Sequence, residues 1–232
     1  MKISIVVPCE VSRLNLFLRT LSDYITHGLD DDIEFVIVSR TIKKFSIPGV
    51  NTKLVKYKYK PKKYFNPSKA LNLGVLNSTH QNIIITCPEV RPITNVIEQL
   101  RGLGRGNYVC QVSDANKNGT IRISLVNSNF RHKTPSYYFL AMYKREDIER
   151  INGWDEHFLD GIGYEDDDFG RRFVLAFTPY HFKVVDSIQG IHQWHQRNDI
   201  DSEGWTINRI KSNNKKKGTD ILPIKGMVKD DN

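Results

Sequence analysis

The 232-residue sequence predicts an α/β fold, in which helices flank a mixed, mainly parallel sheet. Short apolar runs of strand length alternate with segments of helical periodicity, which is the pattern of consecutive βαβ units. The first run, Ile3–Pro8, is almost continuously apolar, as a strand buried on both faces should be. The length and an ordinary hydrophobic content of 39% fit one sizeable domain.

The first half of the chain supplies four predicted strands and two predicted helices. We expect strands at 3–8, 32–38, 53–59 and 82–86, and helices at 14–25 and 67–76. The segment 53–59 alternates between apolar and charged residues, so it is expected nearer an edge of the sheet.

The second half is expected to add shorter elements. We predict helices at 92–103, 145–151 and from 169 onward, and strands at 108–112, 121–126, 137–142 and 182–188. The run 191–195 continues the last strand. Beyond Arg197 the chain turns polar and irregular, with a poorly packed tail expected from about Asn213. We therefore predict a domain over 1–197 and a polar, basic C-terminal extension over 198–232.

Composition narrows the class of protein. No apolar run approaches the length of about 18 residues that a membrane-spanning helix needs, so no membrane span is expected. The apolar start of the chain is too short for a signal peptide. Cys9, Cys87 and Cys110 show neither metal nor disulfide spacing, which predicts reduced thiols and a cytoplasmic location.

The net charge of +8 is distributed unevenly. No acid occurs between Phe35 and Pro88, a stretch that contains ten bases. These are Arg40, Lys43, Lys44, Lys53, Lys56, Lys58, Lys60, Lys62, Lys63 and Lys69. A second basic cluster lies between Arg209 and Lys217. Such patches attract polyanions, although a generally basic, solvated surface explains them equally well.

Four consecutive acids, Glu165 to Asp168, are the most informative feature of the sequence. They follow a loop with Gly161 and Gly163 and begin a predicted helix, where the helix dipole makes crowded negative charge tolerable. Taken alone, the run also fits a solvated acidic helix start. Beside a bound cation or sugar hydroxyls, the same carboxylates can act as a base and as acceptors.

Three other polar clusters follow predicted strands, at 8–13, 86–92 and 192–195. Ligands of open α/β sheets gather at the carboxyl ends of strands. Together the clusters supply a carboxylate, Glu89, and two imidazoles, His192 and His195. Mixed oxygen and nitrogen ligands suit Mn²⁺ or Mg²⁺ bound to a diphosphate. Each histidine taken alone fits a hydrogen-bonded structural role.

Three blocks of the sequence resemble the GT-A glycosyltransferases, family 2-like, with the galactosyltransferase-type C-terminal motif. Phe65-Asn-Pro-Ser-Lys-Ala-Leu-Asn-Leu-Gly74 is similar to the family's Phe-Asn-Arg-Ala-Lys-x-x-Asn-x-Gly segment beside the nucleotide. Cys87-Pro-Glu89 stands where the family has Asp-x-Asp. The stretch from Asn152-Gly-Trp154 to the four acids resembles Asn-Gly-Phe/Trp followed by Gly-Gly-Glu-Asp-Asp-Asp.

This resemblance implies a GT-A fold and site roles for individual residues. Asp166 matches the catalytic base of inverting members, and Glu165 and Asp167 match acids that hold sugar hydroxyls. Glu89, His192 and His195 match the ligands of a Mn²⁺ or Mg²⁺ ion. The implied contacts to the nucleotide sugar are Pro8, Glu10, Arg13, Ser39, Asn66, Lys69, Asn72, Cys87 and Trp154.

Departures from the family pattern leave alternatives open. Cys87 replaces the first Asp of Asp-x-Asp, and a neutral thiol offers a hard cation little. Trp154 and Tyr164 fit either a floor under a sugar ring or ordinary loop packing. The expected donor is a UDP or GDP sugar, and the expected acceptor is a glycan, protein or lipid-linked sugar. A modified base in DNA, suggested by the basic patches, and a non-catalytic carbohydrate-binding relative are the competing hypotheses.

Overall fold

The computed structural model describes residues 1–58, 67–126, 139–158, 163–177, 183–196, 202–216, 220–223 and 225–227. One nine-stranded sheet runs through the molecule in the order β3-β2-β1-β4-β8-β6-β9-β5, with β7 paired to β6. The strands are β1 (Ile3–Pro8), β2 (Ile33–Ser39), β3 (Thr52–Lys56), β4 (Asn82–Thr86), β5 (Val90–Pro92), β6 (Tyr108–Ala115), β7 (Ile121–Val126), β8 (Leu140–Lys144) and β9 (Lys183–His192).

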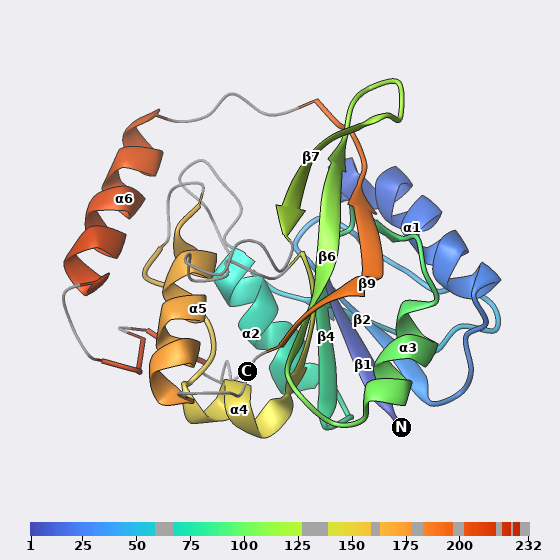
Figure 1. The fold of residues 1–232 in the computed structure, drawn as a ribbon, viewed down its shortest axis with the longest axis horizontal. Coiled ribbons are helices and arrows are strands. Elements are labelled where there is room, and N and C mark those ends of the chain that lie inside the picture. The colour runs from blue at the N-terminus through green and yellow to red at the C-terminus, as the bar shows by residue number, and fades with distance from the viewer. Residues whose placement is uncertain are drawn as a thin grey trace.

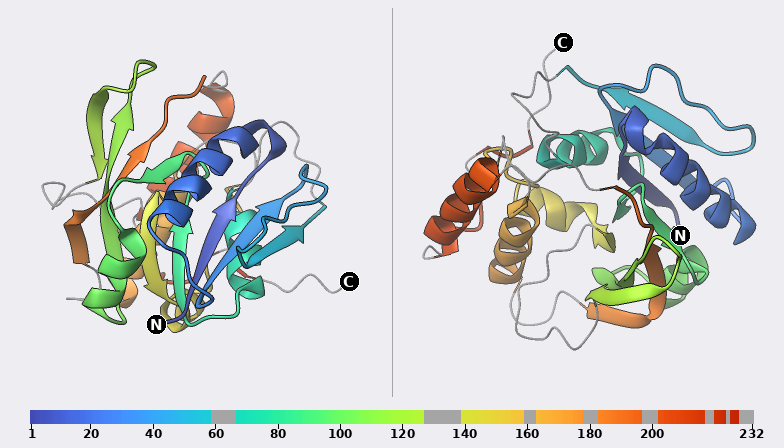
Figure 2. Two further views of the ribbon diagram at one scale, coloured as in Figure 1. Left: turned by 90° about the vertical axis from the view of Figure 1, so that its right-hand side faces the viewer. Right: turned by 90° about the horizontal axis from the view of Figure 1, so that it is seen from above.

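Helices cover both faces of this sheet. In Figure 1, α1 (Leu14–Thr26) and α3 (Val96–Leu103) lie on one side, and α2 (Pro67–Asn77), α4 (Arg145–Arg150) and α5 (Glu165–Ala176) lie on the other. A short 3₁₀ turn, η1 (Val11–Arg13), precedes α1. The last helix, α6 (Ser202–Lys216), lies outside α5 in both figures of the fold (Figures 1 and 2).

The N-terminal half is a parallel α/β unit, as predicted. β1 pairs in parallel with β2 and β4, and β2 pairs in parallel with β3. All seven residues of β2 are buried, which explains its apolar sequence. Helix α2 packs tightly on β1, because a Cβ on Gly74 would lie 2.2 Å from Cγ1 of Val6. The carboxyl ends of β1, β2 and β4 therefore share one edge.

The second half makes the sheet mixed. β8 lies antiparallel between β4 and β6, while β9 runs parallel to β6 and antiparallel to β5. β5 follows β4 along the chain, but four strand spacings separate them in the sheet order. A flat sheet would put about 19 Å between them, whereas the four residue steps from Thr86 to Val90 span at most about 14 Å. The sheet must therefore curl, which returns the end of β9 to the end of β4.

Two segments differ from the sequence prediction. The helix predicted over 92–103 begins only at Val96, where Asn95 caps it by accepting a hydrogen bond from the Glu98 N–H, and Val90–Pro92 forms a strand instead. A three-residue strand carries too little periodicity to be recognised.

No helix among the described residues is long and apolar enough to cross a bilayer.

The prediction of irregular structure beyond Arg197 is wrong for the residues that the structure describes there, because a helix forms. Residues 202–216 form α6, which packs against α5. The following segment lies against the loop before α5: the Glu156 N–H donates to the Lys225 carbonyl at 2.8 Å, and the Met227 N–H donates to the Asn152 carbonyl at 3.2 Å. The domain boundary at residue 197 stays a prediction.

Candidate active site

The ends of β1 and β2 are tied together by residues predicted to bind the nucleotide. Glu10 accepts hydrogen bonds from Nε of Arg40 at 3.1 Å and from the Thr41 hydroxyl at 2.6 Å. The Ser39 hydroxyl accepts from the Ile42 N–H at 3.0 Å, so it closes the turn after β2. Glu10 and Ser39 thus shape this edge, with Pro8 at the last position of β1.

The end of β9 meets the loop between β4 and β5. Val90 pairs with His192, and the Gln193 N–H donates to the Glu89 carbonyl at 2.9 Å. The Gln193 side chain also donates to the Thr20 hydroxyl, which in turn donates to the Pro88 carbonyl. Helix α1 therefore fixes the loop that carries Glu89.

Six side chains gather at this meeting point, and we call them the histidine corner. They are Arg13, Glu89, Asp114, Arg122, His192 and His195. Nε of Arg13 lies 3.1 Å from Oε1 of Glu89, and Nε2 of His195 lies 3.9 Å from the same oxygen. The two imidazole rings lie 5.2 Å apart, centre to centre, and both line a cavity of about 280 Å³.

A carboxylate orients one of the two imidazoles. Nδ1 of His192 lies 3.0 Å from Oδ1 of Asp114, and Arg122 binds the other oxygen of the same carboxylate. Burial alone would raise the pKa of Asp114, but its hydrogen bonds with Arg122 and His192 outweigh burial and lower it. Burial, helped by the charge of Arg13, lowers the pKa of His195. At neutral pH Asp114 is therefore charged and His195 is neutral.

The acidic turn, Glu165 to Asp168, forms the first turn of α5. Tyr164 precedes it at φ 74°, a left-handed conformation that a bulky residue rarely adopts. Burial, followed by the negative charges of Glu165 and Asp167, raises the pKa of Asp166 well above its ordinary value. Asp166 therefore holds a proton more tightly than an ordinary aspartate, which suits a general base.

The half-buried Cys87 lies just after β4 and is under the electrostatic influence of Glu89 and of the acidic turn. Burial first, and then the charges of Glu89, Asp166 and Glu165, raise its pKa well above the ordinary value. Electrostatic effects of this kind fade with distance, which indicates that Glu89 and the start of α5 approach this thiol. The contact that the structure shows directly joins two strand ends, since Glu89 after β4 lies 3.9 Å from His195 after β9. The thiol stays protonated at neutral pH.

Asp168 has a different role from its neighbours. Its carboxylate is buried and pairs with Nε of Arg172 at 2.7 Å and with Nζ of Lys215 at 3.1 Å. Arg172 is also fully buried and donates to the carbonyls of Ile151 at 2.8 Å and Gly153 at 2.7 Å. The pair anchors the loop before α5. Sequence analysis missed Arg172, although its position four residues after Asp168 is the spacing of helical ion pairs.

Two residues predicted to contact the nucleotide sugar belong to the structural support of this loop. Nδ2 of Asn72 donates to the Trp154 carbonyl at 2.9 Å, and the Trp154 N–H donates back to Oδ1 of Asn72 at 2.8 Å. The Trp154 ring is 1% exposed and stacks on Phe169 at 4.0 Å. Of the two readings of Trp154, the structure therefore favours packing. Lys69 lies half-buried on α2, and Asn66 lies outside the described residues.

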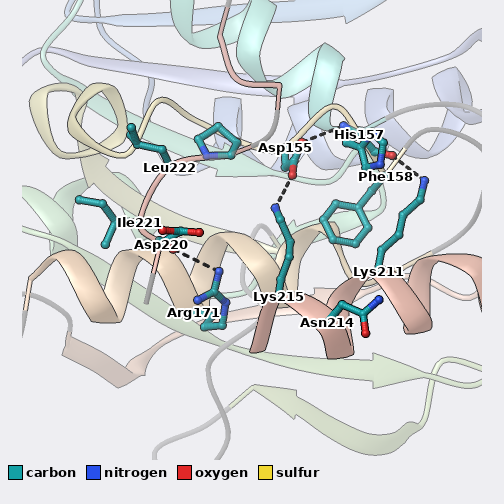
Figure 3. A pocket seen from close by; sticks show the side chains of 11 residues that line it. Asp155, His157, Phe158, Arg171, Lys211, Asn214, Lys215, Asp220, Ile221 and Leu222 are labelled. Carbon is teal, nitrogen blue, oxygen red and sulfur yellow. Dashed lines mark hydrogen bonds and ion pairs between the residues drawn. The ribbon is translucent and has the colours of Figure 1, made fainter. Parts of the chain in front are cut away.

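A second cavity lies between α5, α6 and residues 220–223 (Figure 3). Its volume is about 820 Å³. Its cations have partners within the chain: Lys215 pairs with Asp155, Lys211 donates to the His157 carbonyl at 2.8 Å, and Arg171 donates to the Asp220 carbonyl at 3.3 Å. Size alone therefore does not make this cavity the reactive site.

The histidine corner fits a divalent cation in its types of ligand. One carboxylate oxygen and one or two imidazole nitrogens suit Mn²⁺. Within the described residues, however, no three His, Cys, Asp or Glu side chains converge as a ready metal site. A cation there would need oxygen atoms from a bound diphosphate or from water to complete its coordination.

The fold matches known structures closely in shape and weakly in sequence. S. aureus TarS, residues 1–349, in complex with UDP-GlcNAc superposes with a TM-score of 0.68 at 12% identity, over 91% of this chain and 66% of that one. The mannosyltransferase PcManGT from Pyrobaculum calidifontis, in complex with GDP-Man and Mn²⁺, gives 0.57 at 16% identity, over 91% and 61%. The chain has the GT-A glycosyltransferase fold.

Other comparisons extend this result. The catalytic domain of Drosophila β1,4-galactosyltransferase 7, in complex with xylobiose, gives a TM-score of 0.56 at 14% identity, over 90% of this chain and 79% of that one. A family described as the N-terminal domain of galactosyltransferase matches residues 122–190, less than a third of the chain, including the acidic turn. The chain spans about three fifths of TarS 1–349 in the first superposition. No curated protein sequence matches it.

Proposed function

We propose that this protein is an inverting glycosyltransferase that moves a sugar from a UDP or GDP donor to an acceptor hydroxyl. The observation that carries the proposal is the meeting of two strand ends, where Glu89 after β4 lies 3.9 Å from His195 after β9, beside a thiol whose pKa the charges of Glu89, Asp166 and Glu165 raise further after burial. A GT-A fold binds its ligand at this edge of the sheet. The likeness to structures that hold UDP-GlcNAc or GDP-Man supports the choice of donor.

The chemistry follows from the charges at the site. Arg13 lies beyond the end of β1 and can neutralise the diphosphate that leaves, where negative charge develops in the transition state. Asp166, with its raised pKa, accepts the proton of the acceptor hydroxyl as that oxygen attacks the anomeric carbon from the opposite face. Glu165 and Asp167 flank this base and hold sugar hydroxyls.

The proposal includes a divalent cation, Mn²⁺ or Mg²⁺, for which Glu89, His192 and His195 are the holders. When bound, such an ion supplies Lewis-acid neutralisation of the diphosphate. Asp114 fixes Nδ1 of His192, which leaves Nε2 as the nitrogen for a ligand. Pro8, Glu10 and Ser39 lie at the edge where the nucleotide would rest.

We propose a glycan, protein or lipid-linked acceptor and a cytoplasmic location, which the free thiols of Cys9, Cys87 and Cys110 support. A modified base in DNA is the second candidate acceptor, because basic residues on and after β3 could contact phosphates. These residues include Lys53, Lys56 and Lys58. Transfer to DNA would weaken steeply as salt rises. Transfer to a neutral glycan that is indifferent to salt would favour the first acceptor class.

The direct test is a panel of UDP and GDP sugars, each with and without Mn²⁺. Binding to the folded state at about 100 times Kd stabilises a protein by about 2.7 kcal/mol, so the melting temperature should rise for at least one donor. Hydrolysis or transfer of that donor should be lost in Asp166→Asn, while the thermal shift persists. A flat response across the panel would contradict the proposal.

A further inference from the structure

The corner that resembles a metal site already contains a cation of the protein. Nε of Arg13 lies 3.1 Å from Oε1 of Glu89, and the two side chains are only 23% and 11% exposed. Nε2 of His195 lies 3.9 Å from the same oxygen. A divalent ion that approached Glu89 and His195 would therefore meet the guanidinium of Arg13 at the position of its carboxylate ligand.

The rest of the corner is balanced in the same way. Asp114 is held by Arg122, and its other oxygen contacts Nδ1 of His192. Thus, among the described groups of the corner, each carboxylate is matched by one guanidinium. Sites that bind metal tightly in the absence of substrate instead crowd carboxylates whose charge only the metal neutralises.

We propose that Arg13 is a latch on Glu89, which a nucleoside diphosphate opens so that the diphosphate and the divalent cation bind cooperatively. This inference rests on the proposed function. A guanidinium binds phosphate oxygens in the same forked geometry with which it binds a carboxylate. A diphosphate at the end of β1 therefore competes with Glu89 for Arg13. Once Arg13 turns to the diphosphate, Glu89 is released to the cation.

Cooperativity is reciprocal under this arrangement. The diphosphate raises the affinity for the cation by the same factor by which the cation raises the affinity for the diphosphate. Direct coordination of the cation by phosphate oxygens adds to the coupling and does not depend on Arg13. The property specific to the latch is therefore the weak binding of the cation alone, which removal of the guanidinium should strengthen.

The experiment is calorimetric titration of the 232-residue chain with Mn²⁺ alone, without nucleotide. Arg13→Met keeps most of the side-chain volume and removes the charge, so its affinity for Mn²⁺ should exceed that of the wild type by about tenfold or more, within the usual range of site coupling. Arg19→Met removes one exposed positive charge from α1 and should bind Mn²⁺ like the wild type. Adding Glu89→Gln to Arg13→Met should abolish the gain.

A second titration uses UDP. In the wild type, saturating UDP should strengthen Mn²⁺ binding by more than it does in Arg13→Met, because only the wild type has a latch to open. Arg13→Gln is the alternative variant if the methionine protein does not fold. Equal Mn²⁺ affinity of the wild type and the Arg13 variants without UDP, or Mn²⁺ binding by none of them, would overturn the latch.

The two proposals can fail separately. If donor sugars bind and are transferred but the Arg13 variants bind Mn²⁺ like the wild type, the latch is wrong and the transferase stands. If no nucleotide sugar binds but Arg13→Met still gains Mn²⁺ affinity, the ion pair competes with the metal as described, and the proposed function is wrong.

Discussion

The histidine corner and the acidic turn both contain carboxylates, but their charges are balanced differently. In the corner, Arg13 faces Glu89 and Arg122 faces Asp114, and the pKa of Asp114 is lowered. In the turn, burial and like-charged neighbours raise the pKa of Asp166. The corner is therefore suited to exchanging charged ligands, and Asp166 is suited to taking up a proton.

The acidic turn itself shows the same contrast on a smaller scale. Asp168 lies two residues from Asp166, yet Arg172 and Lys215 neutralise it and its role is to anchor the preceding loop. One run of four acids thus contains both the proposed base and a structural group. The direction in which each side chain leaves the helix decides the difference, and that direction cannot be read from composition.

The largest expected effect is on the rate of sugar transfer, and it tests Asp166 as the proposed base. Asp166→Asn removes the base and should lower the transfer rate by about 10²–10⁴-fold, the usual contribution of general base catalysis. Steady-state kinetics with the donor found in the panel measures it. Asp31→Asn, an exposed acid before β2, is the control and should keep full activity. Transfer that is unchanged in Asp166→Asn would exclude this residue as the base.

The substitution Arg172→Met tests whether the Asp168–Arg172 ion pair stabilises the fold. Removing one partner of a buried ion pair leaves an uncompensated charge, so the free energy of unfolding should fall by about 3–5 kcal/mol. Urea denaturation measures the loss. Lys215→Met should also lower it, because Asp168 keeps Arg172 but the buried Asp155 loses its cation. A larger loss in Lys215→Met than in Arg172→Met would show that the lysine is the main anchor.

The segment Lys225–Met227, which lies against the loop before α5, has no room for a methyl group at Gly226. A Cβ on Gly226 would lie 2.3 Å from Nδ2 of Asn152 and 2.4 Å from its carbonyl oxygen. Gly226→Ala should therefore lower the free energy of unfolding by about 1–3 kcal/mol, as overpacking usually does. Gly102→Ala on α3 meets no atom within 4 Å and should be neutral or stabilising. Equal stability of both variants would place Gly226 outside the supporting contacts.

The smallest effect concerns pH. Because the folded-state pKa of Asp166 is raised, the folded protein binds this proton more tightly than the unfolded chain, and stability falls as pH rises from the ordinary aspartate pKa through the raised one. Asp166→Asn should therefore melt at a higher temperature than the wild type at neutral pH. The gain should shrink in melting curves taken from about pH 8 down to about pH 4. A gain that is independent of pH would mean that packing, not charge, explains it.

Much of the N-terminal fold could be predicted, because its strands are buried on both faces. The apolar runs of β1, β2 and β4 and the amphipathic α1 are local patterns that a sequence displays. β5 and α6 could not be predicted in the same way. β5 has three residues, and α6 is a polar helix, in which Asn208 donates to the Gly163 carbonyl just before α5 at 3.3 Å.

The candidate site divides along the same line. The sequence alone determined which residue types are present and where they stand relative to the strands: a carboxylate after β4, histidines at the end of β9, and four acids at the start of α5. The tertiary structure decided which of them act together. The curl of the sheet brings Glu89 to His195, and Arg13 pairs with Glu89. Asp168 and Trp154 support the loop before α5 instead of facing a ligand. These outcomes depend on contacts between residues far apart in the chain, and local sequence patterns carry no record of such distances.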